Sequence, residues 1–557
     1  MYTVSFKIPG QRNDVKVPAS PGDNILDLAR NNGVDIDAPC SGSGTCGKCV
    51  VRLISGSCEA IKNQHLSEAD FVDGWRLACQ CTVNGDAVFL LPVMAGTYKT
   101  GIDTADLSSP AELELYDRSI DAIFATGLAR GVKEQGYGIA IDIGTTTVTG
   151  ALLDLGTGKV IAKASRGNGQ IRYGADVINR IIQQGKPGGV EKLRSAVREE
   201  TVVPIINTMV KKAGLKDTDV TRLVIAGNTT MEHLFVGADG ASIRLEPYIP
   251  EFLELHGKTA GELGLPATPD APVIFAPNVG SYVGGDITAG VLDTLLWTRD
   301  DMSLFIDLGT NGELVFGNAD YMLTCACSAG PAFEGGDISC GMRATDGAVE
   351  AVSIDEETME PTMNVIGETK KVSGVCGSGL IDLIAELFRC GIIDAKGKFI
   401  RDGKRIHRGE DVSSYVIAFA EDSKYGRDVE LNESDIDNFI RAKAAIFSAI
   451  RSMLNAVDMS IDDIDSVMIA GGIGSGINME NAMRIGMLPK QPMEKYRYIG
   501  NSSLTGACAM LISDEATEKV FELGRNTTYM ELSTEPRYMD EFVAACFIPH
   551  TDATLFD

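Results

Sequence analysis

Five cysteines in the first hundred residues have spacings that suit metal or cluster ligands. Cys40, Cys46 and Cys49 follow one another as C-x5-C-x2-C in the loop APCSGSGTCGKC, and the later segment GWRLACQC contains Cys79 and Cys81. An iron–sulfur cluster requires four thiolates that converge on one volume, with backbone N–H groups directed at its sulfides. Glycines in the loop allow such a wrap, because no Cβ blocks the approach of the backbone. The spacing therefore predicts an iron–sulfur site held by the three loop cysteines and one later cysteine.

The kind of metal centre and its fourth ligand are separate questions. Zinc is the main alternative, but its ligands usually come as two C-x2-C pairs, and this region contains one. Residues i and i+2 of a strand share a face, so the residue pattern leaves both Cys79 and Cys81 open as fourth ligand. The loop, with the hairpin, helix and strands around it, resembles that of plant-type [2Fe–2S] ferredoxins, which have C-x4-C-x2-C. That resemblance implies a [2Fe–2S] cluster, and it favours Cys79 because WRLAC matches the family's closing motif. The implied ligands are Cys40, Cys46, Cys49 and Cys79.

Two later segments have the pattern of phosphate-binding turns. DIGTTT at 142–147 and DLGTNG at 307–312 each place an aspartate at the end of a buried strand, followed by a tight turn with hydroxyl or amide side chains. Such a turn can direct backbone N–H groups and threonine hydroxyls at phosphate oxygens, and the aspartate can hold Mg²⁺ through water. The candidate nucleotide-binding residues in these turns are Gly144, Thr145, Thr146, Thr147, Gly309, Thr310, Asn311 and Gly312.

A third segment, SVMIAGGIGSGINMENAM at 466–483, combines a buried strand, a glycine turn and a helix. The bare backbone of Gly471, Gly472 and Gly474 can lie against a flat ring and a ribose. Together the three segments resemble the phosphate-1, phosphate-2 and adenosine motifs of the acetate kinase/sugar kinase/Hsp70/actin (ASKHA) superfamily. The resemblance implies ATP and Mg²⁺ as ligands. It also implies catalytic roles for Asp142 and Asp307.

Two further acidic residues are candidates near these motifs. Asp286 follows a glycine pair in NVGSYVGGDITAG, and we expect it to orient the attacking water or the metal; a helix N-cap is an equally good interpretation. Glu334 is a weaker candidate for the same role.

These motifs require positioning elements, and the sequence predicts a multidomain chain. Residues 1–96 are predicted to form an α+β, ferredoxin-like (β-grasp) domain with a β-hairpin, a helix capped by Asp23, and later strands including RLACQCTV. Residues 97–136 are predicted to be a linker with a helix around 120–128. Buried strands alternate with amphipathic helices over residues 137–557, which predicts an α/β domain, and the resemblance of its motifs implies an actin-like ATPase. The repeated strand–turn–strand pattern around Asp142 and Asp307 predicts two RNase H-like lobes facing each other across a cleft.

Composition sets further limits. The chain has 557 residues, too many for one hydrophobic core, and 50 basic against 77 acidic residues give a net charge of −27. An acidic surface repels phosphate backbones and anionic lipid, so we expect neither a nucleic acid nor a membrane as partner. The 13 cysteines cluster unevenly, which argues against a disulfide framework, and the first residues lack the pattern of an export signal. We therefore expect a cytoplasmic location.

The combination of ferredoxin domain, linker and actin-like ATPase resembles the reductive activators of corrinoid proteins. The resemblance extends to RYGADVINRI at 172–181, LNESDIDNFIRAKAAI at 431–446 and the tail segment at 529–550. Some members carry an extra middle domain after the linker. Only about forty residues separate the ferredoxin unit from the ATPase here, so we expect that domain to be absent or reduced.

The resemblance implies ATP-dependent transfer of one electron from the [2Fe–2S] cluster to Co(II) of a corrinoid protein, giving Co(I). The partner would belong to a methyltransferase/O-demethylase or corrinoid iron–sulfur protein system, and a low-potential reductase or ferredoxin would load the cluster. The alternatives are a redox-sensing, ATP-driven clamp and an activator of a radical dehydratase, although the latter lack a ferredoxin domain. A sugar kinase has no use for the fused cluster. The sequence leaves open whether the chain is a homodimer.

Overall fold

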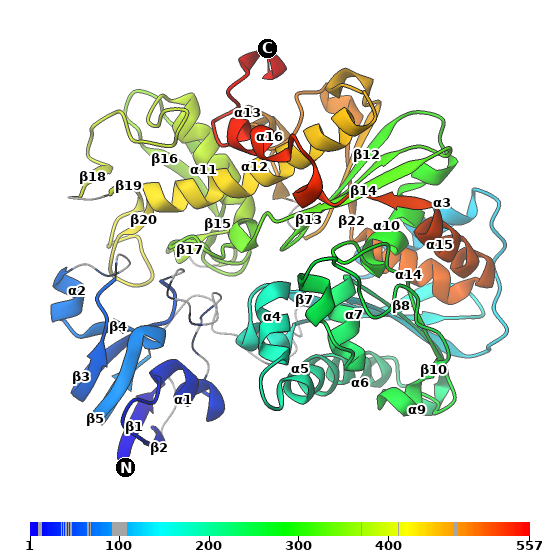
Figure 1. The fold of residues 1–557 in the computed structure, drawn as a ribbon, viewed down its shortest axis with the longest axis horizontal. Coiled ribbons are helices and arrows are strands. Elements are labelled where there is room, and N and C mark those ends of the chain that lie inside the picture. The colour runs from blue at the N-terminus through cyan, green and yellow to red at the C-terminus, as the bar shows by residue number, and fades with distance from the viewer. Residues whose placement is uncertain are drawn as a thin grey trace. The chain divides into compact units, whose positions relative to one another are not determined.

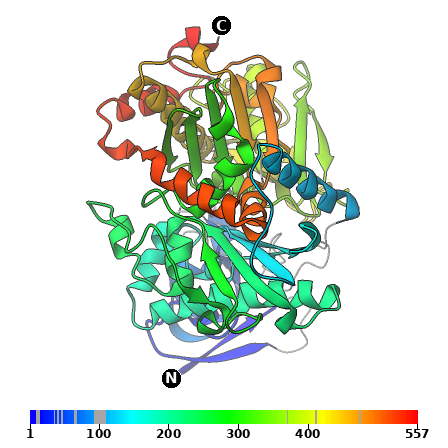
Figure 2. The ribbon, with the colours of Figure 1, turned by 90° about the vertical axis from the view of Figure 1, so that its right-hand side faces the viewer.

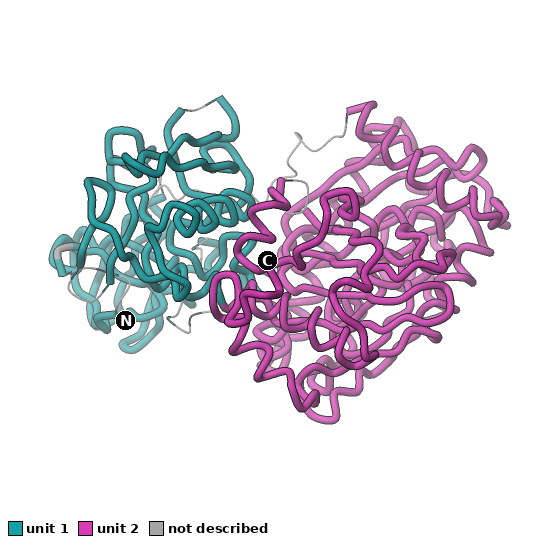
Figure 3. The backbone as a smooth tube through the Cα atoms, turned by 90° about the horizontal axis from the view of Figure 1, so that it is seen from above, with its two compact units in different colours: residues 1–99, 172–175, 331–440 teal, residues 100–171, 176–330, 441–557 magenta. Residues whose placement is uncertain are grey.

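The structure is a computed structural model. It describes residues 1–8, 14–34, 36, 38, 42, 44, 47–63, 66, 68–91, 109–368, 370–409, 412–472 and 476–556. The backbone separates into two compact units (Figure 3). Unit 1 comprises Met1–Lys99, Arg172–Ala175 and Pro331–Ile440, and unit 2 comprises Thr100–Ile171, Asp176–Gly330 and Arg441–Asp557. Among the helices of the described residues, none combines the length and apolar character that crossing a bilayer requires.

The N-terminal part of unit 1 is a five-stranded mixed sheet with one helix against it (Figure 1). The strand order is β2-β1-β5-β3-β4, with β1 antiparallel to β2 and parallel to β5. This confirms the predicted hairpin and the ferredoxin-like fold. Phe6 and Phe89 stack in the core at 6.2 Å between ring centroids. The elements are β1 (Tyr2–Lys7), β2 (Val15–Ala19), α1 (Ile25–Asn31), β3 (Val50–Ala60), α2 (Glu68–Val72), β4 (Trp75–Leu77) and β5 (Cys81–Leu90).

Two local details of this sheet differ from the predictions. Helix α1 is capped by Asn24, whose side-chain oxygen accepts hydrogen bonds from the N–H groups of Leu26 and Asp27, whereas the Asp23 carboxylate accepts one from the N–H of Ser20. The predicted strand RLACQCTV is interrupted, because a 3₁₀ turn at Ala78–Gln80 separates β4 from β5. Cys79 therefore lies in a turn, and the rule that i and i+2 share a face does not apply to Cys79 and Cys81.

The remainder of unit 1 contains two three-stranded sheets. The first has the order β16-β15-β17 and is covered by helix α11, and the second has the order β18-β19-β20. These elements are β15 (Ala348–Ile354), β16 (Pro361–Val365), β17 (Gly374–Val375), α11 (Gly377–Arg389), β18 (Ile406–Arg408), β19 (Ser413–Ala418) and β20 (Val429–Asn432). Helix α12 (Glu433–Ala456) follows β20 and crosses from the residues of unit 1 into those of unit 2.

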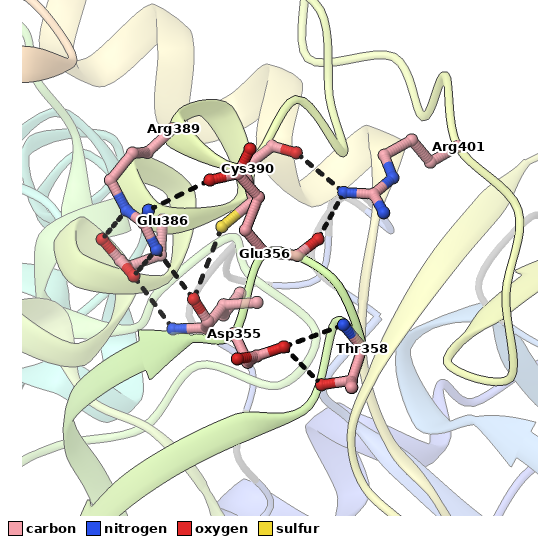
Figure 4. Close-up of polar contacts among 8 residues, drawn as sticks. Asp355, Glu356, Thr358, Glu386, Arg389, Cys390 and Arg401 are labelled. Atoms are coloured by element: carbon pink, nitrogen blue, oxygen red, sulfur yellow. Dashed lines mark hydrogen bonds and ion pairs between the residues drawn. The ribbon is translucent and has the colours of Figure 1, made fainter.

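Polar side chains fasten α11 to the end of β15 (Figure 4). The Glu386 carboxylate accepts a hydrogen bond of 2.9 Å from the N–H of Ile354, and Arg389 donates one of 2.7 Å to the carbonyl oxygen of the same residue. Arg401 donates to the carbonyl oxygens of Glu356 and Cys390 at 2.7 and 3.0 Å. The turn after β15 is therefore tied both to the helix and to the segment that follows it.

Unit 2 contains two six-stranded mixed sheets that share an equivalent five-stranded core and differ in which edge carries the sixth strand (Figures 1 and 2). The first has the order β10-β11-β9-β6-β7-β8 and the second β22-β21-β12-β13-β14-β23. In each, the strand that ends in the motif aspartate forms a hairpin with the next strand and pairs in parallel with the later strand that ends in a glycine turn. This confirms the predicted repeat. The strands are β6 (Tyr137–Ile143), β7 (Thr147–Asp154), β8 (Lys159–Gly167), β9 (Val220–Gly227), β10 (Lys258–Thr259), β11 (Pro272–Phe275), β12 (Ser303–Leu308), β13 (Gly312–Gly317), β14 (Met322–Cys327), β21 (Ser466–Ala470), β22 (Tyr496–Gly500) and β23 (Thr527–Tyr529).

Helices α10 and α14 form the centre of the hydrophobic core of unit 2. Helix α14 packs against β6 and β9 of the first sheet, and α10 packs against α14 and contacts β12 of the second sheet. The backbones approach closely where Gly506 of α14 faces α10, since a Cβ on Gly506 would lie 1.9 Å from the carbonyl oxygen of Ala289. The helices of unit 2 are α4 (Val177–Gln184), α5 (Gly189–Val197), α6 (Val203–Lys212), α7 (Thr229–Val236), α8 (Ala241–Arg244), α9 (Ala260–Leu263), α10 (Gly285–Thr294), α13 (Met479–Arg484), α14 (Ser502–Ile512), α15 (Asp514–Asn526) and α16 (Tyr538–Ala545).

The helix predicted in the linker is present, but it begins earlier. It is α3 (Pro110–Phe124), capped by Ser109, and its residues Ile120 and Ile123 are buried in the core of unit 2. Glu112 forms an ion pair with Lys163 of β8 at 2.5 Å. The second half of the predicted linker is thus packed onto the first sheet of unit 2.

Candidate functional site

Two of the predicted cluster ligands lie side by side in the interior of the ferredoxin-like part. The sulfur atoms of Cys49 and Cys79 are 3.2 Å apart, and both residues are buried. Cys49 directly precedes β3, and Cys79 is held in its turn because its carbonyl oxygen accepts a hydrogen bond from the side chain of Asn24. The α1 cap residue therefore also positions the turn that carries Cys79. Cys40 and Cys46 lie outside the described residues.

Cys81 is engaged elsewhere. Its side chain hydrogen-bonds with that of Cys58 from the neighbouring strand β3, and this interaction lowers the pKa of Cys58 to about 7. The same contact, together with burial, raises the pKa of the Cys81 thiol. Cys79 and Cys81 thus face different partners, which the alternation rule for strands could not reveal.

Two positions of the cysteine loop favour glycine. Gly42 and Gly44 have φ values of +96° and +84°, a region that favours glycine. A Cβ on Gly42 would lie 3.7 Å from Cβ of Cys79, and one on Gly44 would lie 2.6 Å from the amide nitrogen of the Gln80 side chain. Paired buried thiols with a closely approaching glycine backbone fit a group with soft, thiolate-binding metals.

In unit 2, Asp142 ends β6 and is held by two hydrogen bonds from α14. The Asn501 amide donates to one carboxylate oxygen at 2.8 Å, and the Ser503 hydroxyl donates to the other at 2.9 Å. Burial raises the pKa of Asp142, and these two hydrogen bonds oppose the increase. The sequence analysis missed both donors, because they lie more than 350 residues along the chain from Asp142.

The two predicted phosphate turns meet. The hydroxyl oxygens of Thr146 and Thr310 are 3.0 Å apart. Around the first turn, the carbonyl oxygen of Thr145 accepts a hydrogen bond from the buried Arg180, and its hydroxyl accepts one of 2.9 Å from Asn228. These two hydrogen bonds hold the first turn in place, as expected for a turn whose donors bind phosphate.

The other residues predicted for these turns differ in exposure. Gly144 makes the first turn tight, since a Cβ there would lie 2.5 Å from the carbonyl oxygen of Thr147. Thr147 is exposed at the start of β7, whereas Gly312 is buried at the start of β13. Gly309 donates its N–H to the carbonyl oxygen of Asn311, which closes the second turn.

Carboxylates gather around Asp307. Burial and the charge of Asp142 raise the pKa of Asp307 to about 7. Burial, followed by the charges of Asp307 and Asp142, raises the pKa of Asp286 to about 8. Glu313 pairs with Asp307 across the β12–β13 hairpin, and burial together with Asp286 and Asp307 raises its pKa well above the usual value. Oxygen ligands whose charges repel one another in this way fit a hard divalent cation.

Glu232 extends this cluster and was not predicted. It is fully buried on α7, and one of its oxygens accepts a hydrogen bond of 3.0 Å from Asn278, which in turn accepts one from the N–H of Gly285 at the start of α10. Burial raises the pKa of Glu232 well above its usual value, and the hydrogen bond from Asn278 opposes the increase. The N-cap of α10 is Gly284, so the alternative interpretation of Asp286 as an N-cap is wrong.

The adenosine segment is partly described. Gly471 follows β21 with φ +94°, and a Cβ there would lie 2.2 Å from the carbonyl oxygen of Leu308 and 2.8 Å from a carboxylate oxygen of Asp307. Only a glycine at position 471 allows the backbone to lie this close to Asp307. Gly472 follows in the same turn, and Gly474 lies outside the described residues. Glu334 lies in a 3₁₀ turn of unit 1, and its predicted role stays a prediction.

Comparison with known proteins covers almost the whole chain. A 2Fe-2S iron-sulfur cluster binding domain matches residues 8–84, the RACo middle region matches residues 137–298, and the C-terminal ASKHA domain of RACo matches residues 301–557. The corrinoid activation enzyme RamQ of Eubacterium limosum is 32% identical over 93% of this chain and 95% of its own length. This chain belongs to that family of corrinoid activators.

Two further relatives agree with this assignment. The solved structure of a reductive activator for corrinoid, iron-sulfur protein is 39% identical, covers both chains completely and superposes with a TM-score of 0.70. The [Co(II) methylated amine-specific corrinoid protein] reductase of Methanosarcina barkeri is 25% identical over 70% of this chain and 73% of its own. Family membership confirms the ferredoxin and ASKHA assignments. The expectation that the middle domain is absent is wrong, because the middle region of the family corresponds to the first six-stranded sheet and its helices.

Proposed function

We propose that this protein reductively activates a corrinoid protein: it transfers one electron to Co(II), giving Co(I), and couples this transfer to ATP hydrolysis. The observation that carries the proposal is the match to corrinoid activators along nearly the full length of the chain. The paired thiols of unit 1 and the carboxylate cluster of unit 2 support its two chemical parts. The same relatives favour this function over a radical-dehydratase activator or a redox-sensing clamp.

The cluster site consists of Cys40, Cys46, Cys49 and Cys79. The 3.2 Å separation of the Cys49 and Cys79 sulfurs supports Cys79 as fourth ligand, and the engagement of Cys81 with Cys58 argues against Cys81. When bound, a [2Fe–2S] cluster supplies one electron and is itself oxidised by one electron. Cys49 and Cys79 lie in the buried hydrophobic core of the ferredoxin-like part, which limits access of water and oxidants to their sulfurs.

The nucleotide site consists of the two phosphate turns, the adenosine turn and the carboxylate cluster. Thr145, Thr146 and Thr310 present hydroxyls, and the turns present N–H groups, where phosphate oxygens would lie. Asp142 and Asp307 would hold Mg²⁺, which neutralises phosphate charge when bound. Their raised pKa values fall once a cation is present, because an opposite charge favours the ionised form.

Hydrolysis also needs a group that accepts a proton from water. Asp286 is our candidate for orienting that water, since it lies within electrostatic reach of both Asp142 and Asp307 and its pKa is near neutral. Glu313 is a second candidate from the same cluster. Glu232 is a positioning residue, because its bond to Asn278 fixes the start of the helix that carries Asp286.

ATP is required for an energetic reason. Plant-type clusters have potentials near about −400 mV, and the Co(II)/Co(I) couple is expected to lie lower. Each unfavourable gap of about 59 mV reduces a one-electron equilibrium constant tenfold. ATP can help only if its bound and hydrolysed states differ in their affinity for the partner or for the cobalt state. A low-potential reductase or ferredoxin would reload the cluster, and a homodimer is compatible with this scheme.

The test mixes the cluster-loaded activator with a Co(II) corrinoid protein of a methyl-transfer system under anaerobic conditions. The formation of Co(I) is monitored by absorbance. We expect Co(I) to form with ATP and only marginally without nucleotide. Asp142→Asn should keep its cluster spectrum and lose most of the ATP-dependent yield. Asp154→Asn, at the last residue of β7 and away from the phosphate turns, is the matched control and should behave as wild type. Equal yield with and without ATP, or full yield from Asp142→Asn, would refute the coupling.

A further inference from the structure

A histidine and two carboxylates converge on the three-stranded sheet β18–β20 of unit 1, in a part of the fold to which the proposed function gives no role. His407 lies on β18, Glu430 lies on β20 and Asp428 directly precedes β20. Each offers one ligand atom, and these three atoms all lie within 4.8 Å of one another. We propose that His407, Asp428 and Glu430 bind a divalent first-row transition metal, which clips β18 to β20 across the central strand.

The sheet register places these side chains on one face. His407 pairs with Ser414 of β19, and Ser414 pairs with Asn432, which lies two residues after Glu430. Because side chains alternate along a strand, Glu430 and Asn432 share a face, and His407 faces the same way as Ser414. Backbone pairing therefore fixes His407 and Glu430 on one face, while Asp428, just before β20, is held by a hydrogen bond from the N–H of Ala420.

Hydrogen bonds from neighbouring residues orient both carboxylates, and the proposed ligand atoms of Glu430 and His407 contact each other. The Ser414 hydroxyl donates to one oxygen of Glu430 at 2.5 Å, while the other oxygen lies 2.8 Å from Nδ1 of His407. The N–H of Ala420 donates to one oxygen of Asp428 at 2.7 Å. Outer-shell donors of this kind are the usual support of metal-binding carboxylates. Two ligand atoms that each lie about 2.1 Å from a tetrahedral metal ion are about 3.4 Å apart. Binding therefore requires the His407–Glu430 pair, now 2.8 Å apart, to open.

The charge of the cluster also favours a cation. Among the described residues, neither Asp428 nor Glu430 forms an ion pair with a lysine or arginine, and the ionic partner of Glu430 is His407. A second exposed His–Glu pair of the chain differs: Glu254 lies 3.0 Å from His256 and also forms two hydrogen bonds with Arg525. That pair has its negative charge compensated and lacks a third ligand. One imidazole nitrogen with two carboxylate oxygens suits Zn²⁺, Co²⁺ or Mn²⁺ better than a thiolate-seeking ion.

The experiment titrates Zn²⁺ into the full-length protein and measures binding by calorimetry. The protein carries no tag, has its cluster loaded and has been treated with EDTA. Loading the cluster occupies the ferredoxin cysteines, and excess Mg²⁺ occupies the carboxylates of unit 2. We expect one Zn²⁺ per chain. His407→Ala and Glu430→Gln should weaken it at least about 100-fold, and Ser414→Ala about 10- to 100-fold, as loss of an outer-shell partner does.

The His256→Ala variant is the matched control and should bind Zn²⁺ as wild type does. Zn²⁺ should also raise the Tm of wild type and His256→Ala but not of His407→Ala, whose side chain is half exposed and not needed for folding. The proposal is overturned if wild type binds no Zn²⁺, if His407→Ala and Glu430→Gln keep wild-type affinity, or if His256→Ala loses affinity equally. None of these outcomes depends on corrinoid reduction, so the proposal stands or falls independently of the proposed function.

Discussion

Removing the Ser503 hydroxyl should shift the pH dependence of ATP hydrolysis. In the proposed nucleotide site Asp142 holds a cation in its ionised form, which Ser503 and Asn501 stabilise by hydrogen bonds of 2.9 and 2.8 Å. Asn501 is a poorer target, because it also caps α14 through the N–H of Leu504. Ser503→Ala removes one donor and leaves the helix cap in place.

The magnitude follows from the type of bond. A hydrogen bond to a charged group contributes about 1.5–3 kcal/mol, and one pKa unit corresponds to about 1.4 kcal/mol. Loss of the Ser503 bond should therefore raise the pKa of Asp142 by about 1–2 units, in addition to the increase that burial already causes. Activity is lost as pH falls through this pKa, so the acid limb of the profile should move to higher pH by the same amount.

The assay is kcat/KM for ATP between pH 5 and 9, since this ratio reports pKa values of the free enzyme. Ser502→Ala is the matched control: Ser502 is the neighbouring residue of α14, is fully buried and makes no hydrogen bond through its hydroxyl in the described part of the chain. It should keep the wild-type profile. If Ser503→Ala and Ser502→Ala show the same acid limb, the assigned role of Asp142 and its donors is refuted.

Three further outcomes can be checked. Cys79→Ser should lose bound iron and the visible cluster absorbance while Cys81→Ser keeps both, because only the former sulfur lies 3.2 Å from that of Cys49; iron loss in Cys81→Ser alone would reverse the ligand assignment. Gly506→Ala should destabilise unit 2 by at least about 1–3 kcal/mol through overpacking against α10, whereas Gly185→Ala, whose Cβ would meet its first neighbour at 3.6 Å, should not lower the Tm. Burial lowers the pKa of Lys443 to about 7, so unfolding above pH 7 takes up a proton. The free energy of unfolding of wild type should therefore rise relative to that of Lys443→Met, by as much as about 1.4 kcal/mol per pH unit up to about pH 9. Urea unfolding at pH 7 and 9 tests this, and parallel changes in the two proteins would contradict it.

Local sequence patterns were sufficient to predict the motifs and the repeated fold. A cysteine loop with interleaved glycines, an aspartate at a strand end before a glycine turn, and a glycine turn between strand and helix each depend on residues only a few positions apart. The repeat of one such pattern predicted two equivalent sheets, which the structure confirms. Bounds were less accurate, as α3 shows: the predicted stretch 120–128 left out Leu113 and Tyr116, which continue the apolar spacing of Ile120 and pack against the same core.

The sequence by itself determined which chemistry this protein carries: thiolates in a ferredoxin-like domain and phosphate turns in a duplicated α/β fold. The tertiary structure alone decided which side chains act together. The 3₁₀ turn at Cys79, the donors of Asp142 on α14 and the buried Glu313 and Glu232 beside Asp286 all depend on packing between distant elements. Spacing along the chain encodes turns and faces of single elements, whereas a pKa or a ligand set depends on neighbours that only the folded core brings within a few ångströms.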